Sequence, residues 1–210
     1  MTFDFATIDD FDKHIELSIP NYSGLQDVLT ALFKEYMPPR GLCVDLGCST
    51  GSLIKKLRDE VDANYIGIDV IKMPHACDFR FLQMNAASYL VGEKFCDAVF
   101  SIFTLQFLNP TERKETLREL KRLIAQGATV FVAEKFFIDD SRIDSVMRRE
   151  HYRVKRDGFT DTEIMDKDYQ LLGSMFCKKE SELLQELKEL GSPSRIWQSY
   201  NFGAWIIKST

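Results

Sequence analysis

The chain has 210 residues, of which 45% are hydrophobic and 28% charged, and this composition is typical of a globular protein. It excludes a disordered tail, a collagen-like fibre and a small scaffold held together by disulfides. The net charge of −5 excludes a polycation that coats nucleic acid over its whole surface.

The five cysteines are scattered and form no C-x-x-C pair, which argues against a disulfide framework and against a zinc cluster. We therefore expect no metal site and a reducing, cytoplasmic location. The most apolar stretch, 98–108, is interrupted by polar residues and is too short to span a bilayer, and the acidic start of the chain does not look like a secretion signal. The sequence predicts neither secretion nor insertion into a membrane.

In chain order, residues 1–40 are expected to form a helical cap. After them, short runs of β-forming residues alternate with helical patterns, which is typical of an α/β fold with a mostly parallel sheet covered on both faces. The expected strands of this part are 41–45, 65–69, 79–84, 98–102 and 129–133. The helix expected at 52–60 is amphipathic, so one of its faces should pack on the sheet.

Further helices are predicted from their start signals and from their periodicity. Asn109 is a good N-cap, Pro110 suits the first helical position, and Glu112 can close a capping box, so a helix should run from there to about residue 125. The segment 139–179 is longer than a usual α/β connection, and we expect it to be helical and to cover a site.

The end of the chain reads as a helix followed by a hairpin. A leucine pattern predicts a helix at 180–190, and two β-like runs, 195–200 and 204–208, flank a turn expected at 201–203. Tyr200 is interpreted as an aromatic strand residue of this hairpin.

The most informative motif is the run from Asp45 to Gly51, Asp-Leu-Gly-Cys-Ser-Thr-Gly, which follows a strand and precedes a helix. Gly47 allows the backbone to approach a ligand, and the helix N-terminus supplies free N–H groups. Asp69 ends the next strand, eighteen residues after Gly51, where a carboxylate can bind ribose hydroxyls. Together these features favour a nucleoside site over a plain turn and a helix cap.

The G-C-S-T-G pattern with an acid two residues before the first glycine resembles motif I of class I S-adenosylmethionine-dependent methyltransferases. More narrowly, the chain resembles the carboxy-S-adenosylmethionine synthase family, which serves tRNA wobble-uridine modification. The matching runs are 18–23 (SIPNYS), 45–49 (DLGCS), 103–108 (FTLQFL), 111–113 (TER), 134–136 (EKF) and 201–203 (NFG).

The resemblance implies a Rossmann-like methyltransferase fold with a seven-stranded, mostly parallel sheet, an antiparallel C-terminal hairpin, an N-terminal helical cap and an inserted helical lid. The single domain would divide into a cap (1–40), a cofactor-binding core (41–138), a lid (139–179), and a last helix with hairpin (180–210). The implied cofactor is S-adenosylmethionine or its carboxylated derivative. The acceptor is an RNA or a small molecule, no membrane partner is expected, and a homodimer is compatible with the sequence.

Residue by residue, the resemblance implies a cofactor site made of Tyr22, Asp45, Gly47, Cys48, Ser49, Asp69, Val70, Asn85, Ala86 and Ser101. In it, Asp45 holds the methionyl ammonium, Asp69 binds the ribose, and Asn85 lies at the adenine edge. Ile102 stands where the family has a cofactor-binding Asn, and its polar neighbour Ser101 is the candidate substitute, although successive strand residues face opposite sides of a sheet.

The family's carboxylate-gripping arginine falls at Asp168, and an acid cannot hold a carboxylate. The candidate substrate residues are Lys135, Lys167 and Tyr169. We therefore expect methyl transfer, with carboxy-S-adenosylmethionine synthesis from prephenate and a non-catalytic cofactor- or partner-binding module as alternatives. No catalytic residue is assigned, because methyl transfer can rest on alignment alone.

Two charged groups allow more than one interpretation. The basic run of Arg148, Arg149, Arg153, Lys155 and Arg156 is either a phosphate-binding face or, more simply, a solvated helix face paired with neighbouring acids. The pair Glu134 and Lys135 either faces substrate at the carboxyl edge of the sheet or is mutually neutralised. His14, His75 and His151 have no partners at metal-ligand spacing and are interpreted as surface or packing residues.

Overall fold

The computed structural model describes residues 11–72, 78–92 and 95–209. Its α-helices are α1 Phe11–Ser18, α2 Tyr22–Tyr36, α3 Ser52–Glu60, α4 Ala86–Gly92, α5 Pro110–Ala125, α6 Ser141–Lys155, α7 Asp161–Leu171 and α8 Glu180–Leu190. Its strands are β1 Leu42–Leu46, β2 Asn64–Asp69, β3 Arg80–Gln83, β4 Ala98–Ile102, β5 Thr129–Phe137, β6 Lys178–Lys179, β7 Ser192–Ser199 and β8 Phe202–Lys208. The first ten residues of the expected cap lie outside the described part of the chain.

The sheet has the order β3-β2-β1-β4-β5-β8-β7, and β6 adds a two-residue parallel pairing to the end of β5. The pairings from β3 to β5 are parallel, whereas β8 pairs antiparallel with both β5 and β7. The α/β fold with a mostly parallel sheet and an antiparallel C-terminal hairpin is therefore confirmed. The short strand β6 is an addition to the seven strands expected.

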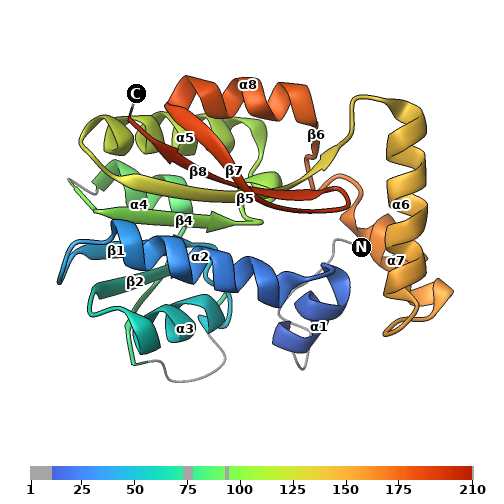
Figure 1. Ribbon diagram of the computed structural model, residues 1–210, viewed down its shortest axis with the longest axis horizontal. Coiled ribbons are helices and arrows are strands. Elements are labelled where there is room, and N and C mark those ends of the chain that lie inside the picture. Colours follow the sequence, from blue (N-terminus) through green and yellow to red (C-terminus); the bar gives the residue numbers. More distant parts are fainter. Residues whose placement is uncertain (1–10, 73–77, 93–94, 210) are drawn as a thin grey trace.

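Helices cover both faces of the sheet (Figure 1). Side chains alternate along each strand, so Val44 joins a core with α4, α5 and α8, and Cys43 joins a second core with α2 and α3. The amphipathic helix α3 buries Leu53, Ile54 and Leu57, as expected from its pattern.

The segment between β5 and α8 is helical, as expected, and forms α6 and α7. These two helices and α1 lie at the same end of the molecule, beyond the sheet (Figure 1). We call α6, α7 and the turn between them the lid.

The hairpin turn expected at 201–203 is wrong in its bounds: the observed turn begins one residue earlier and ends two residues earlier. Tyr200 and Asn201 form the turn, Tyr200 has φ 48°, and Phe202 and Gly203 already belong to β8. The reason is a long-range anchor: the Asn201 side chain donates to the carbonyl of Phe136 and to Asp144 Oδ1, at 3.1 and 2.8 Å. Tyr200 is therefore a turn residue and not the strand residue expected.

The sequence predicts no disulfide framework, no metal site and no membrane-spanning segment, and the described residues bear on each of these expectations. Within them Cys43, Cys48, Cys96 and Cys177 form no disulfide with one another, and no group of three or more potential ligands could hold a metal ion. Cys77 and His75 lie outside the described ranges. None of the described helices is long and apolar enough to cross a membrane.

Candidate functional site

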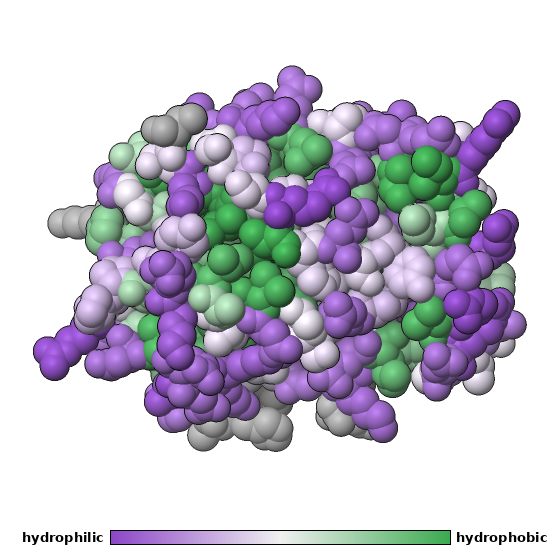
Figure 2. Space-filling view, viewed as in Figure 1, coloured by the Kyte–Doolittle hydropathy of each residue, from purple (hydrophilic) through white to green (hydrophobic). Residues whose placement is uncertain are grey.

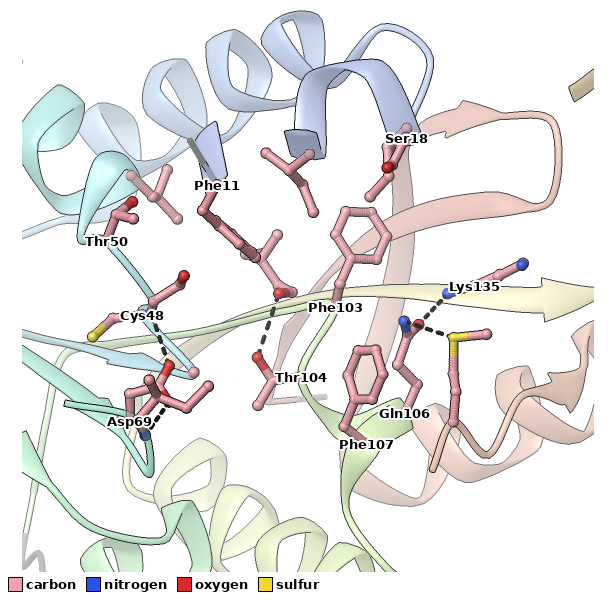
Figure 3. Close-up of a pocket in the computed structure, with 18 of the residues that line it drawn as sticks. Phe11, Ser18, Cys48, Thr50, Asp69, Phe103, Thr104, Gln106, Phe107 and Lys135 are labelled. Carbon is pink, nitrogen blue, oxygen red and sulfur yellow. Dashed lines mark hydrogen bonds between the residues drawn. The ribbon is translucent and has the colours of Figure 1, made fainter. Parts of the chain in front are cut away.

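A cavity of about 480 Å³ opens at the carboxyl ends of the parallel strands, within the size range of small-molecule sites. The loops after β1, β2, β3 and β4 and the end of β5 form its floor, α1 and the start of α2 form one wall, and the lid forms another. Figure 3 shows Cys48 and Asp69 on one side, Lys135 and Gln106 on the other, and Phe103 between them.

The loop after β1 is shaped by one glycine. Gly47 has φ 73°, and a Cβ at this position would lie 2.3 Å from Thr104 Oγ1. The Thr104 hydroxyl in turn donates to the carbonyl of Leu46 at 2.7 Å, so the loop after β4 fixes the loop after β1. Because only glycine fits both the left-handed backbone and this close approach, Gly47 is a geometric requirement of the site.

Asp45 ends inside the cavity with only 3% of its surface exposed. No atom of the described residues donates a hydrogen bond to its carboxylate. Burial, and secondly the negative charge of Asp69, raise the pKa of Asp45 to about 8. A carboxylate in this environment favours a cationic ligand, because a positive partner would offset the cost of its burial.

Asp69 lies at the end of β2 and bridges two loops. Its carboxylate accepts hydrogen bonds from the backbone N–H of Ser49 at 2.8 Å and of Ile71 at 2.9 Å. Each carboxylate oxygen keeps a second lone pair for a ligand. Val70, which follows, lines the cavity and is 61% exposed, so it offers an apolar surface at the cavity mouth.

Asn85 is already engaged on both sides of its amide. Its Nδ2 donates to Glu112 Oε1 at 2.9 Å, and its Oδ1 accepts from the N–H of Ala87 at 2.8 Å. Glu112 closes the expected capping box of α5 and also lines the cavity beside Asn85 and Ala86. The adenine edge predicted for Asn85 would therefore meet a Glu–Asn pair rather than a lone amide.

Tyr22 lies at the start of α2 and lines the cavity next to Phe103, with ring centroids 6.4 Å apart. Burial raises the pKa of Tyr22 to about 12, so its hydroxyl is a neutral donor near pH 7.

Two of the predicted site residues are not in the cavity. Ser101 is fully buried, faces away from it, and leaves its Oγ without a hydrogen-bond partner among the described residues, whereas the next residue, Ile102, lines the cavity. The alternation of strand side chains explains this exchange. Tyr169 is 73% exposed on the outer side of α7, while its neighbours Lys167 and Asp168 face inward.

Three lysines line the lid end of the cavity: Lys135 from β5, Lys155 from α6 and Lys167 from α7. Burial and the charges of the other two lower the pKa of Lys167 to about 7, and burial also lowers that of Lys155. Lys155 belongs to the basic run that was interpreted as a solvated face, but only 5% of its surface is exposed.

The signal that could have identified Lys155 is its spacing from His151, since residues four apart share one face of a helix. His151 also lines the cavity, and its Nε2 is 2.9 Å from the carbonyl of Ser18. Burial lowers the pKa of both His151 and His14 to about 4, so both rings are neutral near pH 7.

The rest of the basic run does behave as a solvated face. Arg153 pairs with Glu150 at 2.8 Å, and Arg156 pairs with Asp161 at 2.6 Å. Asp168 faces the cavity but accepts a short hydrogen bond from the hydroxyl of Tyr152, so its carboxylate has a partner on the lid itself.

Glu134 and Lys135 do not neutralise each other, since they point to opposite sides of β5. Glu134 is buried and forms an ion pair with Arg113 at 3.0 Å. Arg113 also forms an ion pair with Glu186. Gln106, missed by sequence reasoning as a site residue, accepts from the N–H of Lys135 at 2.7 Å and lines the cavity. The buried acid therefore supports the strand end that presents Lys135.

Comparisons with known proteins can be set against this geometry. The profile of a methyltransferase domain matches residues 44–132, which span the strands and loops from β1 to β5 that form the cavity floor. This part of the chain is therefore similar to a methyltransferase domain. Its part from Asp45 to Ala86 supplies most of the predicted cofactor residues.

The matched region 44–132 lies within a longer similarity to curated proteins. A carboxy-S-adenosyl-L-methionine synthase from Mannheimia succiniciproducens is 28% identical over 222 residues, which cover 98% of this chain and 92% of that protein.

Solved structures share the fold at low identity. An O-methyltransferase family protein from Burkholderia thailandensis has a TM-score of 0.62 and 13% identity over 90% of this chain and 56% of that one. Human N-acetylserotonin methyltransferase, solved in complex with SAM, has a TM-score of 0.61 and 13% identity over 90% of this chain and 52% of that one. This chain therefore spans about half the length of both.

Proposed function

We propose that the protein is an S-adenosylmethionine-dependent transferase of the methyltransferase type, which binds S-adenosylmethionine or S-adenosylhomocysteine in the cavity. The observation that carries the proposal is Asp45, a buried carboxylate that faces the cavity and has no cationic partner among the described residues. The methionyl ammonium of the cofactor supplies that partner. Its charge offsets the burial that raises the pKa of Asp45.

The other cavity residues fit the remaining parts of the cofactor. The Gly47 loop leaves room beneath a ligand, the free lone pairs of Asp69 suit ribose hydroxyls, and Asn85 with Glu112 offers acceptors for an adenine amino group. When bound, the cofactor supplies a methyl group activated by its sulfonium.

The residues of this chain would contribute mainly by positioning. Phe103 and Phe202 pack edge to face, with ring centroids 5.8 Å apart, on the wall between the two ends of the cavity. These rings and the lid would exclude water and hold an acceptor in line with the transferred group. His151 in the cavity and His14 beside Lys167 are neutral near pH 7, but alignment alone can sustain methyl transfer, so no general base is assigned.

Isothermal titration with S-adenosylhomocysteine tests the proposal. Wild-type protein should bind it, and Asp45→Asn should bind at least about tenfold more weakly, because a charge-assisted contact is lost. Asp59→Asn, an exposed residue of α3, is the matched control and should bind as wild type does. Failure of the wild-type protein to bind would contradict the proposal, and binding without turnover of any acceptor would favour the non-catalytic alternative.

Carboxy-S-adenosylmethionine synthesis is the second candidate, and two observations favour it. Its curated representatives match almost the whole chain. In addition, Asp168 is engaged by Tyr152 and is accompanied by three lysines in the same cavity, which weakens the objection that an acid stands at the arginine position. Mass spectrometry after incubation with S-adenosylmethionine and prephenate decides between the two: carboxy-S-adenosylmethionine as product supports the second candidate, and unchanged cofactor supports the first.

The proposal also includes the location of the protein, its oligomeric state and its acceptor. These are a cytoplasmic location, association as a homodimer, an RNA or small-molecule acceptor, and a link to tRNA modification. The small molecule that copurifies with the protein, identified by mass spectrometry, would show which cofactor form the cavity holds.

A further inference from the structure

A groove of about 490 Å³ lies between α5 and α8, outside the cavity. The two helices pack side by side on one face of the sheet (Figure 1). The apolar part of the groove lining consists of Leu108, Pro110, Leu117, Phe176 and Leu190. We call this surface the α5–α8 groove.

Positive charge follows the α5 side of the groove. Lys114, Arg118 and Lys121 are exposed and lie three or four residues apart, so they share one face of the helix. From the first to the third, the row rises about 10 Å along the helix axis. Within the described residues neither Lys114 nor Lys121 forms an ion pair, whereas Arg118 pairs with Glu119 at 3.1 Å. Both ammonium groups are therefore available to an anionic partner.

The acids of the groove do not neutralise this row. Glu186 pairs with the buried Arg113 at 2.7 Å and with Lys178 at 2.6 Å, so its charge is already balanced. Glu189, in the last turn of α8, is the other acid in the lining, against five cations in all. The groove is therefore basic, on a chain whose net charge is −5.

An exposed aromatic ring lines the same groove. Phe176 is 39% exposed and makes no ring contact with another aromatic side chain within the described residues. Its backbone N–H donates to the carbonyl of Gln106 at 2.6 Å, which holds this segment in place. A positive groove with an exposed aromatic ring suits a single-stranded nucleic acid, because the cations bind phosphates while a base stacks on the ring.

The groove adjoins the proposed cofactor cavity. Leu108 lines both the groove and the cavity. The consecutive residues Met175 and Phe176 are divided between them, since Met175 lines the cavity and Phe176 lines the groove. A polymer that lies in the groove is therefore next to the cavity that would act on it.

From this arrangement we infer that the α5–α8 groove binds an unpaired stretch of RNA, with its phosphates along the α5 row and a base on Phe176. RNA presents such unpaired bases in its loops. The inference rests on the proposed function, and it narrows the acceptor class from an RNA or a small molecule to RNA. An acidic protein segment would meet the same cations, but it has no base to stack on the aromatic ring.

Fluorescence anisotropy of a labelled oligouridylate, titrated at several salt concentrations with S-adenosylhomocysteine present, tests the inference. Wild type should bind the RNA, and its affinity should fall as salt rises. Lys121→Gln should flatten the slope of log Kd against log salt by about 0.7, the contribution of one phosphate contact on a single strand. Phe176→Leu should weaken binding at least about fivefold without changing this slope, because it removes stacking but no charge. The control is Lys188→Gln, an exposed position of α8 outside the groove lining, which should bind as wild type does.

The inference is overturned if wild type does not bind the RNA, if Lys121→Gln keeps the wild-type slope, or if Phe176→Leu binds as tightly as wild type. It is also overturned if an oligoglutamate of equal charge displaces the RNA at the same concentration, because the groove then accepts an acidic protein segment equally well. Titration with S-adenosylhomocysteine alone separates these failures from a failure of the proposed function. Both groove variants lie outside the cavity and should bind it as wild type does, and if wild type does not bind it, the proposed function fails.

Discussion

The ionisation of Asp45 depends on what lies beside it. Without a ligand its pKa is about 8, so the side chain is mostly protonated at pH 7. An ammonium partner lowers that pKa, and binding of S-adenosylhomocysteine should therefore release protons at pH 7 and tighten as the pH rises from 6 to 8. Titration calorimetry in buffers of different ionisation enthalpy measures this release.

The same experiment on Asp45→Asn isolates the contribution of this residue. The amide cannot ionise, so the difference in proton release between wild type and variant belongs to Asp45. An equal release from both proteins would show that another group titrates.

The second prediction concerns replacement of Gly47, the glycine that shapes the loop after β1. Gly47→Ala forces a Cβ to within 2.3 Å of Thr104 Oγ1 and strains a left-handed backbone. The free energy of unfolding should therefore fall by about 1–3 kcal/mol. Cofactor binding should weaken as the loop shifts. Gly92→Ala is the control, since nothing lies within 4 Å of the added carbon. Chemical denaturation and titration calorimetry of both variants measure the two effects, and equal behaviour of the variants would contradict the prediction.

Single residues also show where sequence reasoning reaches its limit. Gly47 and Asp69 could be predicted as a pair because their motif is local and ordered along one βαβ unit. Lys155 was missed because its neighbours in sequence, Arg153 and Arg156, are exposed, and its inward orientation depends on how α6 packs. Its spacing of four residues from His151 was the one local signal. Ser101 was proposed as the polar neighbour of Ile102, which stands at the family's Asn position, and strand alternation directs the Ser101 side chain away from the cavity.

At the scale of elements, two capping boxes allow a comparison of core and lid. Asn109 caps α5, which packs in the core, and Thr160 caps α7, which belongs to the lid. Replacing either residue by Ala should cost about 1 kcal/mol of helix stability. Asn109→Ala should lower the global free energy of unfolding. Thr160→Ala should instead increase hydrogen exchange mainly within the lid, because lid helices can open without global unfolding. The same global loss in both variants would contradict this division.

The fold could be predicted from the sequence wherever the signals are local. The Asn109 cap, the amphipathic pattern of α3 and the leucine pattern of α8 each determine their own helix. The hairpin turn and the end of β5 could not be predicted to the residue. The pairing of Lys135 with Phe202 extends β5. The hydrogen bonds of Asn201 to Phe136 and Asp144 shift the turn. Both contacts join segments that are distant in sequence, so no local pattern predicts them.

For the whole molecule, the net charge of −5 conceals an internal separation of charge. The face seen in Figure 2 is mainly polar, with a broad apolar area left of centre and smaller apolar groups at the end where Figure 1 places the lid. Inside, one cavity is lined by Asp45 at one end and by three lysines at the lid end, Lys135, Lys155 and Lys167. Buried charges without partners lower the free energy of unfolding of the ligand-free protein, and ligands of complementary charge offset this loss.

The cost can be measured on the ligand-free protein. Lys167 has a pKa of about 7 in the folded state against 10.5 for the ordinary side chain, so the unfolded chain binds more protons between these values. The Lys167 contribution to stability should therefore rise with pH from 7 to 10.5, and its penalty is fully present below pH 7. Lys155→Met removes a repelling charge, so it should raise the melting temperature at pH 8 and flatten the rise toward pH 10.

Asp168→Asn removes the attractive charge and should lower the melting temperature, while Lys188→Met should leave it unchanged. Each kcal/mol corresponds to a shift of about 2–4 °C for a chain of this size. Scanning calorimetry at several pH values measures all three variants. A lower melting temperature for Lys155→Met would mean that packing of the Lys155 alkyl chain outweighs the repulsion between Lys155 and the other two cavity lysines. An unchanged slope with pH would mean that Lys167 titrates independently of Lys155.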